Sequence, residues 1–177
     1  MKYKSKLLGD ITKVLMGLVS RADTVSNSHL KKDPNLNAKK GDGIYVLSKK
    51  ELKSLNLTEI EFKEYVKPFY KNSDITRYYS KKNNSLYLLY IKDTGYSINL
   101  PLSLKQHFIK FKHLLTELKR NFLKNEIAAP FVRRWLEQGN YFVLFNPKKE
   151  EYFDFEKIVC PYRSKKNSFA YNNQPWY

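Results

Sequence analysis

The most strongly periodic stretch of the sequence is PLSLKQHFIKFKHLLTELKRNF, residues 101–122. Its apolar residues recur in steps of three and four, which is the spacing of one helix face. They are Leu104, Phe108, Phe111, Leu115, Leu118 and Phe122. We therefore expect one long helix over residues 104–122, with Ser103 as its N-cap. Lys105, Lys112 and Lys119 recur every seven residues on a different stripe of this helix.

Shorter helices are expected on both sides of this stretch. Ser48 with Glu51, and Thr58 with Glu61, have the capping-box spacing, and the second box predicts a helix to about Tyr65. Another helix is expected over residues 130–138, because Gly139 can end it. The polar, turn-rich residues 23–43 predict a long loop.

Apolar and β-branched runs predict short strands between these helices. Residues 77–80 and 85–91 flank a polar turn at residues 81–84, which favours a hairpin. The other expected strands lie at residues 11–20, 43–47, 141–145, 157–160 and 168–171. Strands and helices do not alternate regularly. We therefore predict an α+β fold with a mostly antiparallel sheet, one long helix and one or two short helices.

Composition limits the function classes. The chain has 177 residues, which suits a single domain, and its net charge of +16 is typical of a protein that binds a polyanion. No apolar run approaches the ~18 residues of a membrane span. The sequence has a single cysteine, Cys160, which excludes a disulfide framework and a zinc site made of cysteines. Asp10 and Lys13 interrupt the apolar start, so we expect a cytoplasmic protein without a secretory signal.

The sequence predicts no catalytic centre, and therefore a non-enzymatic chain without a cofactor or metal. His29, His107 and His113 lack a metal-ligand spacing. Gly41-Asp42-Gly43 lacks the third glycine of a dinucleotide loop. Lysines follow Asn146-Pro147, where an adenine-methylating pocket has a proline and an aromatic residue. Glu-x-Lys triplets such as Glu51-Leu52-Lys53 leave a magnesium nuclease as a weaker alternative.

Cations interleaved with aromatic residues are the candidate binding groups, at residues 77–79, 133–135 and 162–166. The alternative is a solvated basic surface with the aromatic rings turned inward, and for Trp135 we favour a core position. Arg163 is the candidate for a base edge, the lysines are candidates for phosphates, and Asp74 is expected to be a turn or cap residue. The full set of candidate DNA-binding residues is Lys71, Arg77, Tyr78, Lys105, Lys112, Lys119, Arg120, Arg133, Arg134, Arg163, Ser164 and Lys165.

The order of several short motifs resembles the TaqI-like C-terminal specificity domain. The resemblance begins with Val66-Lys67-Pro68-Phe69 and Asp74-Ile75-Thr76-Arg77-Tyr78. It continues through the strand at residues 86–91 and the helix residues Phe111, Leu115 and Arg120. Arg134-Trp135, the segment at residues 155–161 and Phe169-Ala170-Tyr171 complete it. It divides the single domain into lead-in strands and a loop, residues 1–59, and a specificity core, residues 60–177.

The resemblance implies a target recognition domain for double-stranded DNA. Such a domain would position DNA for a separate adenine-N6 methyltransferase domain of a restriction-modification enzyme. Some parent enzymes of this family also carry an endonuclease activity, and the sequence leaves that open. The methyltransferase domain, with its S-adenosylmethionine, would precede residue 1 in the parent protein. The alternative left open is an RNA- or single-strand-binding module, which would need exposed stacking aromatics.

Overall fold

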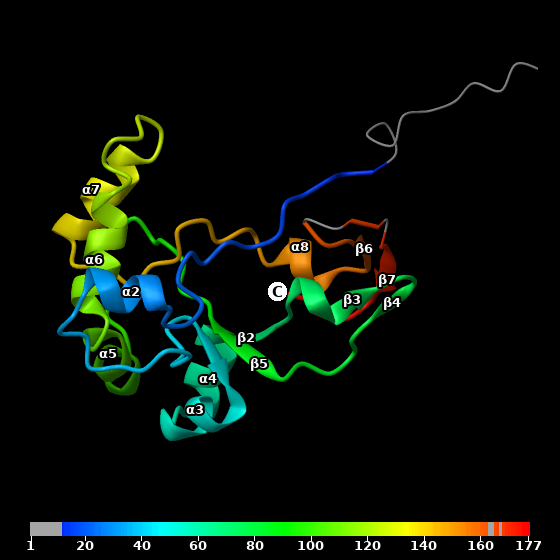
Figure 1. Ribbon diagram of the computed structural model, residues 1–177, viewed down its shortest axis with the longest axis horizontal. Helices are drawn as coiled ribbons and strands as arrows, with labels where there is room; N and C mark the ends of the chain where they lie inside the picture. The colour runs from blue at the N-terminus through cyan, green and yellow to red at the C-terminus, as the bar shows by residue number, and fades with distance from the viewer. Residues whose placement is uncertain (1–11, 163–164, 167) are drawn as a thin grey trace, which may run out of the picture.

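The computed structural model describes residues 12–162, 165–166 and 168–177. Within this part of the chain, short helices and antiparallel strands form an α+β fold, as predicted (Figure 1). The helices are α2 (Asn27–Lys32), α3 (Lys49–Ser54), α4 (Glu59–Tyr65), α5 (Leu102–Ile109), α6 (Lys112–Arg120), α7 (Ala129–Glu137), α8 (Glu151–Asp154) and the 3₁₀ turn η1 (Asn72–Asp74). The strands are β1 (Val46–Ser48), β2 (Val66–Phe69), β3 (Ile75–Thr76), β4 (Tyr79–Ser80), β5 (Leu86–Leu89), β6 (Lys157–Val159) and β7 (Ala170–Asn172).

A three-stranded antiparallel sheet in the order β1-β5-β2 anchors the main core. Its register pairs Val46 with Leu88 and Val66 with Leu89, and these four side chains are buried. The predicted hairpin between residues 77–80 and 85–91 is therefore wrong, because β5 pairs with β1 and β2 on its two sides. Strand β4 pairs with β3 instead.

The predicted single helix over residues 104–122 is two helices. Helix α5 ends at Ile109, and Phe111 precedes α6 with φ −107° and ψ 6°, outside helical geometry. Phe111 is buried, as are Leu104, Phe108 and Leu115, so the predicted apolar face does point into the core. The break lets both short helices pack against one core. Pro101, and not Ser103, is the N-cap of α5.

Local signals in the sequence are confirmed at the other helices. Both capping boxes form, with Ser48 and Glu51 at α3 and with Thr58 and Glu61 at α4. Helix α7 ends just before Gly139, whose φ of +74° suits a glycine. The expected loop over residues 23–43 contains helix α2, which a third capping box starts at Ser26.

Two expected strands are absent from the described residues. Residues 12–18 have no regular structure, and Val19 makes only an isolated bridge to Asn146. Residues 141–145 are not a strand, although Phe142, Val143 and Leu144 are buried. Their apolar pattern reflects burial under the sheet and helices instead of strand pairing. In the described ranges, no helix is long and apolar enough to cross a membrane.

Two small hairpins form a separate region beside the main core. Strands β3 and β4 make one hairpin, and β6 pairs with β7 in the other. They pack on a second small core that contains Tyr70, Ile75, Ala170 and Trp176. Figure 1 shows these four strands at one end of the long axis and helices α5, α6 and α7 at the other.

Candidate nucleic-acid interface

The two small hairpins have one buried face and one exposed face, as the alternation of side chains along a strand requires. Ile75, Ser80, Ala170 and Asn172 point inward and are buried. The exposed residues that alternate with them along the strands, and Ile158, which pairs with Tyr171, lie on the opposite, outward side. We call this outward surface, with the hairpin loop, the hairpin face. It consists of Arg77, Tyr78, Tyr79, Ile158, Phe169 and Tyr171.

Hydrogen bonds join the two hairpins into one unit. The Ser80 hydroxyl donates to the backbone oxygen of Tyr171 at 3.2 Å and accepts from the Asn172 amide at 2.9 Å. The backbone N–H of Tyr78 donates to the carbonyl of Phe169 at 2.8 Å. Polar groups on the buried side are thus paired across the junction, and the junction fixes how the two hairpins lie relative to each other.

A stacked aromatic pair packs against the buried side of the hairpins. The Tyr70 and Trp176 rings stack with centroids 4.6 Å apart. Trp176 Nε1 donates to the carbonyl of Lys81 at 3.1 Å, and the Tyr70 hydroxyl donates to that of Lys82 at 3.0 Å. These bonds fix the chain as it leaves β4. The hairpin face therefore rests on a packed base, which is how rigid scaffolds present binding residues.

Exposed apolar and aromatic side chains gather on the hairpin face. Tyr78 is 77% exposed, Tyr79 55% and Tyr171 60%, and Ile158 and Phe169 are also exposed. Arg77 lies against this surface: its guanidinium group is 5.0 Å from the Tyr78 ring centroid and donates to the Tyr78 hydroxyl at 3.1 Å. A planar cation beside exposed rings can contact a phosphate while the rings contact bases.

The predicted site residues separate into two groups. Lys71, Arg77, Tyr78 and Lys165 lie at the hairpin end, and all four are exposed. Arg163 and Ser164 lie outside the described residues. Asp74 is the predicted turn residue, because its carboxylate accepts a 2.8 Å hydrogen bond from the N–H of Lys71.

The second group lies on α5, α6 and α7, at the other end of the molecule (Figure 1). Lys105, Lys112, Arg120 and Arg133 are exposed there. Some cations of this group have partners within the chain. Arg120 pairs with Glu117 at 2.6 Å, Arg134 pairs with Asp93, and Lys105 bonds the Asn99 side chain. Lys112 has its ammonium group 5.8 Å from the Tyr141 ring centroid and remains open to solvent.

The prediction that Lys119 contacts phosphate is wrong, because its side chain is fully buried. Its Nζ lies 4.3 Å from the ring centroid of Phe145 and 5.0 Å from that of Trp135. Trp135 is buried, as predicted. Helix α7 packs against α6 and covers this position of the lysine stripe. Burial lowers the pKa of Lys119 to about 7.

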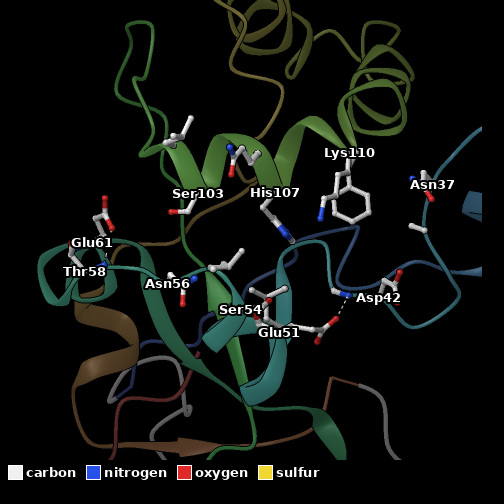
Figure 2. A pocket seen from close by; sticks show the side chains of 17 residues that line it. Asn37, Asp42, Glu51, Ser54, Asn56, Thr58, Glu61, Ser103, His107 and Lys110 are labelled. Carbon is white, nitrogen blue, oxygen red and sulfur yellow. Dashed lines mark hydrogen bonds between the residues drawn. The ribbon is translucent and has the colours of Figure 1, made fainter.

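A cavity of about 700 Å³ lies between α5 and the segments that carry α3 and α4. Figure 2 shows His107 on α5 and Lys110 just after α5 on one side of it, with Glu51, Asp42 and Glu61 on the other. These carboxylates already accept backbone hydrogen bonds. Glu51 accepts from the N–H groups of Gly43 and Ser48, each at 2.7 Å, Glu61 from Thr58 and Asp42 from Lys39. Their role is to hold the loops around the cavity.

His107 is the most buried titratable group in this cavity. Burial lowers the pKa of His107, although its hydrogen bond to the Ile44 carbonyl opposes that effect. A neutral imidazole that is hydrogen-bonded to the backbone has a structural role, so we do not assign His107 to a catalytic site. Among the residues that the structure describes, no three His, Cys, Asp or Glu side chains group as a metal site.

Sequence reasoning did not assign Ile158, Phe169 or Tyr171 to the site. Phe169 and Tyr171 alternate with Ala170, and that period-two pattern could have indicated an outward aromatic row. No protein-family model matches the chain, and no curated protein matches it. The resemblance to the TaqI-like specificity domain therefore stays a prediction.

Proposed function

We propose that this chain is a recognition domain that binds double-stranded DNA through the hairpin face. The observation that supports this proposal is the presence of Arg77 and five exposed aromatic or apolar side chains on two hairpins that are hydrogen-bonded to each other. A net charge of +16 adds long-range attraction for a polyanion. Following the resemblance, the domain would present DNA to a separate adenine-N6 methyltransferase domain in the cytoplasm.

The two groups of cations have different roles in this proposal. At the hairpin end, the Arg77 guanidinium group has the fork geometry that suits a phosphate or a guanine edge. At the helical end, Lys112 and Arg133 are exposed point charges that would contact phosphates without reading sequence. Because the two groups lie at opposite ends of the long axis, both can contribute only if the duplex runs along the molecule.

A second candidate function is the binding of single-stranded nucleic acid. The hairpin face favours it, because Tyr78, Tyr79, Phe169 and Tyr171 are at least half exposed and could stack on unpaired bases. Aromatic residues on the surface of a small sheet are used in this way by modules that bind RNA and single strands.

Competition binding distinguishes the two candidates. A labelled short duplex is bound at low salt and displaced by the same unlabelled duplex or by either of its single strands. Duplex recognition predicts that the duplex displaces best and that affinity falls with salt, with a log–log slope of about −0.9 per phosphate contact. Better displacement by a single strand selects the second candidate, and no binding to either refutes both.

A paired variant tests whether the hairpin face is the binding surface. Tyr79→Ser with Tyr171→Ser removes two outward rings without changing the buried side of the strands. The matched control is Tyr96→Ser, since Tyr96 is 78% exposed and lies outside the hairpins. We expect the double variant to bind at least about tenfold more weakly and the control to bind normally. In this proposal the chain itself is not an enzyme, so S-adenosylmethionine and duplex should give no methylated DNA.

A further inference from the structure

Tyr78 occupies a backbone conformation that its residue type disfavours. It is the second residue of the two-residue loop between β3 and β4, and its φ is +64°. Glycine or asparagine usually occupies such a position, because a side chain with a bulky Cβ substituent crowds the backbone there. Strained residues of this kind cluster at functional sites. Local folding therefore does not account for a tyrosine at this loop.

The loop is held in place despite this conformation. The Tyr78 N–H bonds the Phe169 carbonyl of the neighbouring hairpin at 2.8 Å. Directly behind the loop, Thr76 pairs with Tyr79 and Ile75 with Ser80. Ile75 belongs to the small core that contains Trp176. The tyrosine thus projects from a tip whose position is fixed by both hairpins.

The Tyr78 ring has one flanking cation and little other cover. Its side chain is among the most exposed large hydrophobic groups of the described residues, at 77%. Arg77 donates to its hydroxyl at 3.1 Å, which orients the ring and brings a positive charge beside it. A flat ring can stack between two neighbouring bases, and a guanidinium group beside it can contact the negative phosphate that links them.

We propose that Tyr78 inserts between neighbouring bases of bound duplex DNA, with Arg77 on the adjacent phosphate. This inference rests on the proposed function and assigns to the loop the task of opening a base step. Side chains that act as wedges exchange base–base stacking for stacking on the protein. Insertion is therefore easiest where stacking is already interrupted, so the chain should prefer a duplex that lacks one base.

Binding to two duplexes tests the insertion without knowledge of the recognised sequence. The duplexes are identical except that one carries a single abasic site at its centre. We expect the wild-type chain to bind the abasic duplex at least about fivefold more tightly, as one base–aromatic stack allows. Tyr78→Phe keeps the ring and should keep this preference.

Tyr78→Asn is the decisive variant. Asparagine tolerates a positive φ, so the loop should fold, and a thermal unfolding midpoint at or above the wild-type value checks this. It should bind both duplexes equally, whereas the control Tyr96→Asn should behave as wild type. Wild-type binding that is equal for both duplexes would overturn the insertion and leave duplex recognition standing. A wild-type chain that binds neither duplex would refute duplex recognition, and the insertion with it.

Discussion

The ammonium group of Lys119 donates a 2.7 Å hydrogen bond to the backbone carbonyl oxygen of Val143 inside the main core. The rings of Trp135 and Phe145 flank the same ammonium group. A second cation, Arg21, lies with its guanidinium carbon 4.2 Å from the ring centroid of Phe122 and 5.7 Å from that of Phe145. Around Lys119, which is fully buried, the rings partly compensate for the loss of water, whereas Arg21 remains exposed.

Stability should rise with pH above neutrality because of Lys119. Its folded pKa of about 7 lies below the ordinary 10.5, so between these values the unfolded chain binds the proton more tightly. The free energy of unfolding therefore increases with pH in this window, by up to about 1.4 kcal/mol per unit. Urea unfolding at several pH values from 7 to 9 measures the slope. Lys119→Met should flatten it, and parallel curves for the two proteins would contradict the assignment.

Lys112→Ala should weaken DNA binding without changing sequence preference. Lys112 is exposed on α6, and a lysine that contacts one phosphate contributes about one unit to the slope of log affinity against log salt. Titration at several salt concentrations with preferred and scrambled duplexes measures both effects. Lys53→Ala on α3 is the control for the loss of one exposed charge. If the two variants have the same slope, the helical end does not contact DNA.

Glu51→Gln should lower the free energy of unfolding by about 1–2 kcal/mol at pH 7. Burial alone would raise the pKa of Glu51, but hydrogen bonds from Ser48 and Gly43 outweigh it and lower that pKa. A lowered folded pKa means that the stabilisation is complete above the unfolded pKa and is lost as pH falls through the folded one. The deficit of the variant, measured by urea unfolding, should therefore shrink in acid. Glu61→Gln, in the more exposed capping box of α4, should lower the free energy of unfolding by less.

Trp176→Leu should weaken DNA binding and stability together. The change removes the stack on Tyr70 and the hydrogen bond to the Lys81 carbonyl, at a cost of about 2–4 kcal/mol. Thermal unfolding and duplex binding are measured on the same samples. Phe153→Leu is the control, since Phe153 stacks on Tyr177 in the main core. Equal affinity for both variants would show that the aromatic base does not support the binding surface.

Features that depend on neighbouring residues could be predicted from the sequence. The boxes at Ser48 and Thr58 involve residues three positions apart, so pattern and structure agree. The apolar face of residues 104–122 also points inward, because amphipathic periodicity reports burial directly. That pattern does not reveal the break at Phe111, since a buried aromatic residue fits the helix face and the junction equally well.

Features that depend on distant partners could not be predicted. Strand β5 follows a polar turn that is typical of a hairpin, yet it pairs with β1 and β2, which are distant in sequence or precede that turn. Lys119 matches the exposed spacing of Lys105 and Lys112, but α7 and residues 143–145 pack over it and bury it. The candidate site combines Arg77 and Tyr78, which the sequence indicates, with Tyr171, which comes from a distant segment that no local pattern connects to them.

The bond between Ser80 and Asn172 joins residues 92 positions apart in the chain. A pairing so distant in sequence has a high entropic cost of loop closure, so it forms late compared with a helix or a local turn. During synthesis, the β3–β4 hairpin cannot form its contacts with the second hairpin until β7 has been made. We therefore expect the hairpin face to form late in folding. In a Trp135→Phe variant, the fluorescence of Trp176 after dilution from urea should report this as a phase slower than helix formation.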